Sequence, residues 1–270
     1  MSRFLETMAS RSRARADAAR RNRSLHDLRR SVLSGRGRQP RPLVRFGESF
    51  DLIAEVKPRS PSEGAFPERD PAAKAAGYAR GGAAAISVLT EPSEFGGSLR
   101  ILNMVSEAVT VPVMAKDFLV DPYQVYEARE AGADGILVIA RILTDEAMAE
   151  VLDAVAETGM FSLVEAFDRD DLERVSTLVA KRDFLVGVNC RDLETLEIVP
   201  GRHEELAAHI APARVAVAES AIAEAADVER VASLGYRAAL VGSILMRSGD
   251  ATRLVREMVD AGRRTVAVAR

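Results

Sequence analysis

The chain is poor in cysteine and lacks any long apolar run. Cys190 is the single cysteine in 270 residues, so a disulfide within the chain is excluded and a cytoplasmic location is expected. No apolar run approaches the roughly 18 residues that a membrane-spanning helix needs. We therefore expect no membrane partner.

The formal net charge of −3 gives no general reason to expect nucleic acid as a partner. Residues 1–45 differ from the rest, because they contain 13 arginines, no lysine and only three acids. No aromatic residue lies among the arginines from residue 11 to 45, which argues against nucleic-acid binding there. We expect residues 1–46 to be an Arg-rich helical extension packed on the following domain. An organellar transit peptide is the alternative.

Within this extension, the stretch 4–33 is predicted to form one or two polar helices. Glycine and proline at Gly35, Gly37, Pro40 and Pro42 would end them before the next domain begins.

From residue 51 onward, one pattern recurs every 25–30 residues. A short apolar run ends in polar residues, and a helical stretch follows. Such continuous hydrophobicity is typical of parallel strands that are buried on both faces. The expected strands are Asp51–Val56, Ala84–Val88, Val111–Ala115, Gly135–Ala140, Phe161–Ala166, Phe184–Asn189, Arg214–Ala218 and Ala238–Val241.

Eight strand-helix units with short links favour closure into a barrel. We therefore predict an α/β fold, a (β/α)8 TIM barrel, over residues 47–270. The competing fold, an open doubly wound sheet, would carry a Gly-rich loop after its first strand. This chain has Lys57 and Pro58 there instead.

Lysine is scarce, with four residues against 33 arginines, yet Lys57 and Lys116 both follow apolar strands. The active site of such a barrel forms at the C-terminal ends of its strands. A desolvated ammonium can give up its proton, whereas a guanidinium effectively cannot. These positions therefore favour proton transfer or imine chemistry. The alternative is that the two lysines form structural salt bridges with Glu55 and Glu165.

Carboxylates end two of the apolar runs, at Glu165 and Glu219, while Glu55 shares a strand face with Lys57 two residues later. A buried carboxylate is costly unless it is paired, and a lysine across the barrel mouth would supply the partner. Such pairs would also be poised for acid–base work, although structural pairing alone is an alternative for each acid. Asn189 at another strand end suits the orientation of a substrate hydroxyl or a lysine.

Small residues after the last two strands indicate a phosphate site. Ser220 and Ala221 follow one, and Gly242 and Ser243 follow the other, where backbone amides can approach an anion. The segments 60–64 and 95–97 contain glycine and are expected to be flexible lids.

The sequence indicates no metal site, no nucleophilic cysteine and no nucleotide-binding motif. His26, His203 and His209 have no metal-ligand spacing and are expected at the surface, so no metal is predicted. Cys190 has no histidine near it in the sequence, which argues against a nucleophilic role. No P-loop or dinucleotide fingerprint is present.

Several motifs in order resemble the indole-3-glycerol phosphate synthase family. They are IAEVKPRSPSEG (53–64), SVLTEPSEFGGSL (87–99), PVMAKDFLVDPYQVYEAREAGAD (112–134), LVEAF (163–167), VGVNCRDLETLEI (186–198), VAESAI (217–222) and LVGSILM (240–246). Each is moderately specific alone, but the ordered set is highly specific. The resemblance implies decarboxylating ring closure of 1-(2-carboxyphenylamino)-1-deoxyribulose 5-phosphate to indole-3-glycerol phosphate, without a cofactor or metal.

The resemblance also implies roles for single residues. Lys116 would protonate the ribulose carbonyl, Glu165 would act at the anilino nitrogen or in the dehydration, and Glu55 and Lys57 would complete the acid–base set. The remaining roles are orientation of substrate and lysines by Asn189 and Arg191, contact with the ribulose part by Glu219 and Ser220, phosphate binding by Ser60, Gly242 and Ser243, and packing on the anthranilate ring by Phe118.

The chain departs from the family pattern at four positions, Pro58, Phe167, Cys190 and Ala221. Where Ala221 stands, the family usually has glycine beside the phosphate, and alanine is expected to exclude positive φ angles there. The alternatives are a paralogue with a modified anthranilate-type substrate, a Schiff-base lyase, and a non-catalytic phosphate-ligand barrel. A phosphorylated small molecule is the expected partner, and we expect a monomer or weak homodimer.

Overall fold

Eight parallel strands close into a barrel in the computed structural model, which describes residues 3–35, 37–44, 46–66, 70–178, 184–193 and 195–268. Around the barrel the strands follow the order β1-β10-β9-β8-β7-β6-β5-β4, which confirms the predicted (β/α)8 fold. The strands are β1 (Asp51–Val56), β4 (Ala85–Leu89), β5 (Val113–Lys116), β6 (Gly135–Ile139), β7 (Phe161–Ala166), β8 (Leu185–Asn189), β9 (Ala216–Glu219) and β10 (Ala238–Val241).

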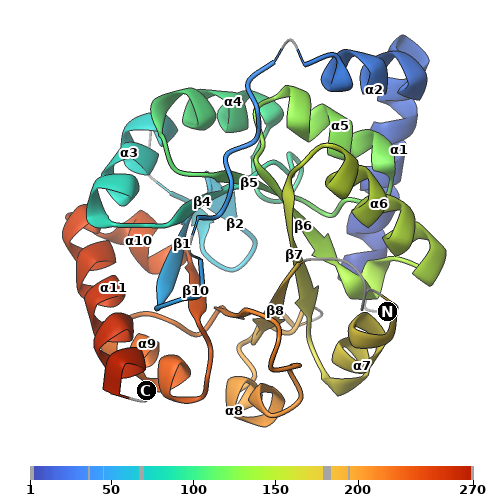
Figure 1. Ribbon diagram of the computed structural model, residues 1–270. Helices are drawn as coiled ribbons and strands as arrows, with labels where there is room; N and C mark the ends of the chain where they lie inside the picture. The colour runs from blue at the N-terminus through green and yellow to red at the C-terminus, as the bar shows by residue number, and fades with distance from the viewer. Residues whose placement is uncertain are drawn as a thin grey trace.

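Helices connect the strands and cover the outside of the barrel (Figure 1). The side chains of Asp121 and Thr144 cap two of these helices by accepting hydrogen bonds from backbone amides in the first turn. The helices are α3 (Pro71–Gly81), α4 (Leu99–Ala108), α5 (Pro122–Glu130), α6 (Asp145–Glu157), α7 (Arg169–Leu178), α8 (Arg202–Ala207), α9 (Ala225–Ser233) and α11 (Ala251–Val268), with the short η1 (Ala140–Ile142) and α10 (Ser243–Arg247).

Three strands end one residue later than the sequence predicts; β4 runs to Leu89, and the other two end on charged residues. β5 runs to Lys116 and β9 to Glu219, so both charged residues are the last residues of their strands rather than the first of the following loops. In the parallel register Lys116 lies opposite Leu89, and Glu219 lies opposite Asn189. The backbones of Lys116 and Glu219 are therefore held by the sheet itself, which fixes where their side chains start.

Two short strands, β2 (Arg59–Ser60) and β3 (Gly64–Ala65), form an antiparallel hairpin directly after β1. The sequence did not indicate them, because each is only two residues long and glycine and proline surround them. The hairpin lies over the C-terminal end of β1, where a flexible loop was expected.

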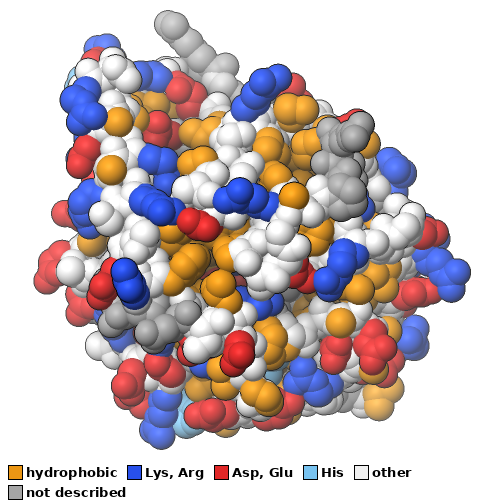
Figure 2. All heavy atoms as spheres, turned by 180° about the vertical axis from the view of Figure 1, so that it is seen from behind, with side chains coloured by type: hydrophobic (Ala, Val, Ile, Leu, Met, Phe, Trp, Pro, Cys, Tyr) orange, Lys and Arg blue, Asp and Glu red, His pale blue; other side chains and the backbone are white. Residues whose placement is uncertain are grey.

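Two helices precede the barrel, α1 (Arg3–Asn22) and α2 (Leu25–Leu33), as the sequence predicts. α1 buries Leu5, Met8, Ser12 and Ala16, whose spacing places them on one face of the helix. Arginines from the segment 11–41 pair with barrel carboxylates, including Arg11–Glu94, Arg15–Asp117, Arg20–Asp121, Arg23–Glu130, Arg29–Glu157 and Arg41–Asp134. Acidic and basic side chains accordingly lie side by side along the edge formed by α1 in Figure 2.

These ion pairs form a seam between the N-terminal segment and the barrel. The seam explains why arginine is concentrated in residues 1–45. Much of the positive charge of the N-terminal segment faces carboxylates of the barrel. We propose that residues 1–46 are the extension and residues 47–270 the barrel domain, as expected from the sequence. None of the described helices is long and apolar enough to cross a membrane.

Candidate active site

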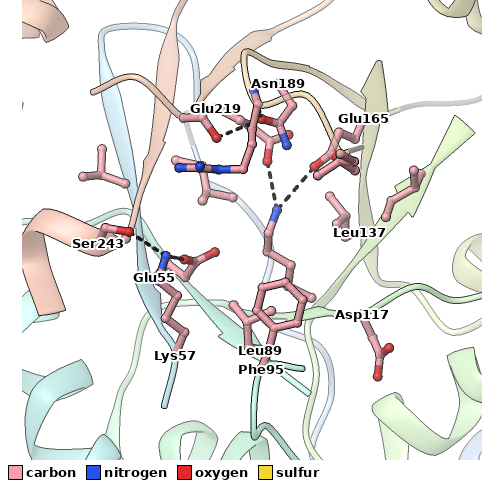
Figure 3. Close-up of a pocket in the computed structure, with 18 of the residues that line it drawn as sticks. Glu55, Lys57, Leu89, Phe95, Asp117, Leu137, Glu165, Asn189, Glu219 and Ser243 are labelled. Atoms are coloured by element: carbon pink, nitrogen blue, oxygen red, sulfur yellow. Dashed lines mark hydrogen bonds and ion pairs between the residues drawn. The ribbon is translucent and has the colours of Figure 1, made fainter. Parts of the chain in front are cut away.

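A cavity opens at the C-terminal ends of the barrel strands (Figure 3). All residues that the sequence selects for the site line this cavity, except Ser60. They are Glu55, Lys57, Lys116, Phe118, Glu165, Asn189, Arg191, Glu219, Ser220, Ala221, Gly242 and Ser243. Apolar side chains complete the wall, among them Leu89, Phe95, Leu137, Ile139, Leu193, Ile222 and Leu240.

Lys57 lies on one side of the cavity, between the ends of β1 and β10. Its Nζ is 3.1 Å from Glu55 Oε1 and donates a hydrogen bond to Ser243 Oγ at 2.9 Å, as Figure 3 shows. A Cβ atom at position 242 would collide with the Glu55 carboxylate, so Gly242 leaves the space that this carboxylate fills. Gly242, which was predicted to approach the phosphate, therefore also makes room for the Glu55 carboxylate.

Lys116 lies on the other side, between two carboxylates. Its Nζ is 3.3 Å from Glu165 Oε2 and 3.0 Å from Glu219 Oε2. Both carboxylates are almost fully buried and point into the cavity (Figure 3). Gly187 leaves room for Glu219, since a Cβ atom there would collide with Glu219 Oε1.

Charge sets the protonation of this cluster. Burial alone would lower the pKa of Lys116, but the negative charges of Glu219, Glu165 and Glu55 outweigh it and raise the pKa above its ordinary value. Burial raises the pKa of Glu219, and the neighbouring Glu165 adds to this, whereas Lys116 opposes it. Glu219 Oε1 is buried and meets no donor. Lys116 therefore stays protonated at neutral pH, and Glu219 is a carboxylate that can accept a proton.

Both predicted salt bridges of the structural alternative are present, Lys57–Glu55 and Lys116–Glu165. The site nevertheless contains more than such pairs require, because a third carboxylate, Glu219, shares Lys116. All of these groups also face an open cavity lined by apolar side chains. This arrangement favours a working site over purely structural pairing.

Asn189 organises the end of β8 and the turn after β9. Its Oδ1 accepts hydrogen bonds from Ser220 Oγ at 2.8 Å and from the Arg191 backbone amide at 2.9 Å. The Arg191 guanidinium donates to Leu196 O at 2.6 Å, which braces the loop after β8. The Asn189 side chain is thereby fixed on the cavity wall, with its amide group as the remaining donor.

The turn at Ser220 and Ala221 corrects one expectation. Alanine at position 221 was expected to exclude positive φ, yet Ala221 has φ 53° and Ser220 has φ 64°. Both angles fall in the small left-handed region that L-residues can enter at an energetic cost. The hydrogen bond from Ser220 Oγ to Asn189 helps hold this strained turn.

Aromatic side chains and a buried acid shape the outer rim. Phe118 packs on Phe95 and on Phe4 of α1, with ring centroids 6.1 and 6.0 Å apart. Glu91, which is fully buried, accepts hydrogen bonds from the backbone amides of residues 93, 94 and 95. Although burial would raise the pKa of Glu91, these bonds and that of the Ser93 hydroxyl lower it. The loop expected to be a flexible lid is therefore built around a fixed carboxylate.

Sequence reasoning missed Glu91 as a part of the site. The signal was present, since Glu91 follows an apolar strand as Glu165 ends one. It also gave no role to Asp117, which directly follows Lys116, or to Arg15, which pairs with Asp117. Arg15 is 2.6 Å from Asp117 and 3.6 Å from Glu91, contacts between residues far apart in the chain that no local pattern could indicate.

His203 corrects a second expectation. It was expected at the surface but is 1% exposed, under Tyr236, with its Nδ1 buried and without a partner. Cys190 is also buried, and burial raises its pKa to about 11, which leaves the thiol protonated and unreactive. No group of metal-ligating side chains occurs among the described residues.

Comparisons with known proteins agree with this geometry. A family model described as indole-3-glycerol phosphate synthase matches residues 5–258. The chain is 46% identical to the indole-3-glycerol phosphate synthase of Nocardioides sp. over 237 residues, 87% of this chain and 90% of the relative. It is 40% identical to indole-3-glycerol phosphate synthase 1 of Streptomyces coelicolor, over 92% of each chain.

Among solved structures, the barrel is similar to that of 3-hexulose-6-phosphate synthase from Salmonella typhimurium, with a TM-score of 0.65. That match covers 80% of this chain and 100% of the other at 17% identity, so it supports the fold alone.

Proposed function

The chain belongs to the indole-3-glycerol phosphate synthase family, and from this premise we propose that it closes the indole ring of 1-(2-carboxyphenylamino)-1-deoxyribulose 5-phosphate. The products are indole-3-glycerol phosphate, CO₂ and water, in a step of tryptophan biosynthesis. The observation that carries the proposal is the position of Lys116, held between Glu165 and Glu219 in a cavity with apolar walls.

In the first step, the ring carbon that bears the carboxylate attacks the ribulose carbonyl carbon. The carbonyl oxygen gains negative charge, and Lys116 is the protonated group placed to donate to it. Attack breaks the aromaticity of the ring, so this step needs an acid already in position and few competing waters. Loss of CO₂ then returns the electrons of the broken bond to the ring.

In the second step, the new hydroxyl gains a proton and leaves as water, and the intermediate loses a proton, so this step needs both an acid and a base. Glu219 and Glu165 are the bases within reach of Lys116 Nζ, and Glu219 is the one whose raised pKa suits it to accept a proton. The same carboxylates stabilise positive charge on the anilino nitrogen as water departs. Asn189 and Ser220, joined by their hydrogen bond, border the ribulose hydroxyls.

The two ends of the cavity differ in a way that orients the substrate. Lys57 and Ser243 form the polar end, where we place the phosphate, with Gly242 and Ala221 lending backbone amides. Phe118 and Phe95 form the apolar end, which suits the anthranilate ring. Arg191 and Lys57 are the cations of the wall available to the ring carboxylate before it leaves.

The decisive experiment is to incubate the purified protein with 1-(2-carboxyphenylamino)-1-deoxyribulose 5-phosphate and follow indole fluorescence. Turnover at a rate of about 1 per second or more would be ordinary for such an enzyme. Absence of fluorescence, with the substrate demonstrably bound, would overturn the activity and favour a paralogue for a modified substrate.

The raised pKa of Lys116 argues against a Schiff-base lyase, because imine formation needs a neutral amine. Borohydride trapping with the substrate distinguishes the two mechanisms. A stable covalent adduct on either lysine would overturn the acid–base mechanism.

The remaining expectations accompany this function. We propose a cytoplasmic enzyme that binds a small phosphorylated substrate without cofactor or metal, and that does not bind nucleic acid or membranes. We further propose that it is a monomer or weak homodimer, which analytical ultracentrifugation over a range of concentrations would test.

A further inference from the structure

Glu63 stands beside the polar end of the cavity and has no place in the mechanism above. It lies in the turn between β2 and β3, and its Oε1 accepts a hydrogen bond from Arg247 Nη1 at 2.5 Å. Arg247 is the last residue of α10, the short helix that begins at Ser243. The pair therefore joins the hairpin over β1 to the element that supplies the Ser243 hydroxyl.

The surroundings of Glu63 are strongly positive. Burial would raise the pKa of this carboxyl, but the Ser243 hydroxyl and the charges of Arg247, Lys57 and Arg191 together lower it. Glu63 is therefore an anion at neutral pH, placed among cations and beside a hydroxyl. Phosphate is an anion that the same groups would bind.

Two buried polar atoms of the β2–β3 hairpin have no hydrogen-bond partner within the described part of the chain. Ser60 Oγ, on the same hairpin, is buried and makes no hydrogen bond, and Glu63 Oε2 is buried without a donor at hydrogen-bond geometry. Buried polar atoms without a hydrogen-bond partner are rare in native proteins, because their loss of water is not compensated. A second anion bound beside the hairpin could accept the hydrogen bond that the Ser60 hydroxyl does not make here.

The turn of the hairpin is open on the side of Gly64. Gly64 follows Glu63 with φ 74°, and a Cβ atom built there would meet nothing within 4 Å. The only hydrogen bond that holds the Glu63 carboxylate among the described contacts comes from Arg247, so displacement of Glu63 requires the loss of this one bond. Arg247, whose side chain is 55% exposed, would then have a free guanidinium at the end of α10, the helix that begins at Ser243.

We propose that the Glu63 carboxylate is a built-in competitor of the substrate phosphate, and that Arg247 binds the phosphate once Glu63 is displaced. This inference rests on the proposed function in one respect, that the ligand of the polar end is a phosphate. Two like charges cannot share one set of cations without repulsion, so the carboxylate and the phosphate exclude one another. Arg247 is the group that exchanges one partner for the other.

A simple latch would give a different result. If the Arg247–Glu63 pair only closed the hairpin over the ligand, loss of either partner would weaken phosphate binding. Competition predicts effects of opposite sign, because Glu63 opposes the phosphate whereas Arg247 attracts it. The sign of two matched substitutions therefore separates the two models.

The experiment measures the Kd of inorganic phosphate by calorimetry and its inhibition constant, in wild type, Glu63→Gln and Arg247→Gln. We expect Glu63→Gln to lower both constants by about tenfold and Arg247→Gln to raise both by about tenfold, the usual scale for one nearby charge. Arg253 and Glu257 form an exposed pair on α11, so Glu257→Gln and Arg253→Gln make the same changes of net charge elsewhere. Those controls should shift either constant less than twofold.

Changes of the same sign in the two variants, or no change in either, would overturn competition. Undetectable phosphate binding in all of the variants would overturn it as well. Failure of the proposed function has a separate signature, namely no indole fluorescence from the phosphorylated substrate while the two variants still move phosphate binding in opposite directions. Thermal unfolding of each variant verifies that it is folded.

Discussion

Arg15 of α1 donates a hydrogen bond at 2.6 Å to Asp117, the residue that directly follows Lys116. Asp117 also accepts from the Thr90 hydroxyl and from the Phe118 backbone amide. Burial raises the pKa of Asp117, and Arg15 opposes that shift. The N-terminal helix is therefore connected to the strand end that carries the proposed proton donor.

We predict that Arg15→Gln lowers kcat by roughly threefold to tenfold, because Asp117 loses the cation that holds it and the Lys116–Phe118 segment gains freedom. The KM for the substrate should change less than kcat. Steady-state kinetics would measure both. Arg13→Gln, an exposed arginine on the same helix, is the matched control, and an equal loss in that variant would show that only helix charge matters.

Lys116→Ala should abolish turnover while leaving substrate binding within about tenfold, since its proton serves the transition state more than the ground state. Single-turnover fluorescence measures the chemical step, and calorimetry measures binding. Lys74→Ala, on α3 and outside the cavity wall, is the control for loss of a lysine. Near-normal turnover in the Lys116 variant would contradict its assignment as the acid.

Ala221→Gly should raise the free energy of unfolding by up to about 1 kcal/mol, because glycine adopts the left-handed conformation at this turn without strain. Ala223→Gly in the same segment is the control, and it should lower stability by roughly 0.5 kcal/mol through the unfolded chain. Denaturant titration compares the two. Destabilisation by both glycines would show that the turn at residue 221 is not strained.

The stability of the fold should fall with acid through His203. Burial, helped by Arg230, lowers the pKa of His203 from 6.5 to about 4. The unfolded chain therefore takes up the proton first as the pH falls. The contribution of His203 is complete above pH 6.5 and is lost between pH 6.5 and 4, by about 3 kcal/mol in all.

Unfolding free energies measured across this range should show a weaker pH dependence for His203→Asn than for wild type. His209→Asn, at an exposed position shortly after α8, should keep the wild-type dependence. Parallel curves for wild type and the His203 variant would contradict the assignment.

The fold could be predicted from the sequence because buried parallel strands are continuous apolar runs, which are easily recognised. The sequence indicates Lys57, Lys116 and Glu165 for the same reason, since a charge next to an apolar run is conspicuous. His203 was misjudged because a histidine looks alike in a sequence whether it is buried or exposed. The left-handed turn at Ala221 depends on Asn189 and Ser220, whose contact forms only when two strands lie side by side.

The rim of the site depends still more on tertiary contacts. Glycines at positions 96 and 97 suggest mobility when read locally, but the loop wraps Glu91 and is tied to Arg59, whose amide donates to Phe95 O at 3.2 Å. A Cβ atom at Gly97 would collide with the Leu89 carbonyl, so that glycine permits close packing rather than movement.

The seam between α1 and the barrel has a consequence for how the enzyme responds to its medium. Because it depends on many pairs of opposite charge near the surface, dissolved ions screen it while they leave the apolar barrel core almost untouched. We therefore expect rising ionic strength to weaken the attachment of α1 before it affects the barrel core. The salt content of the medium should accordingly affect how firmly α1 holds Phe4 against Phe118 at the rim of the site.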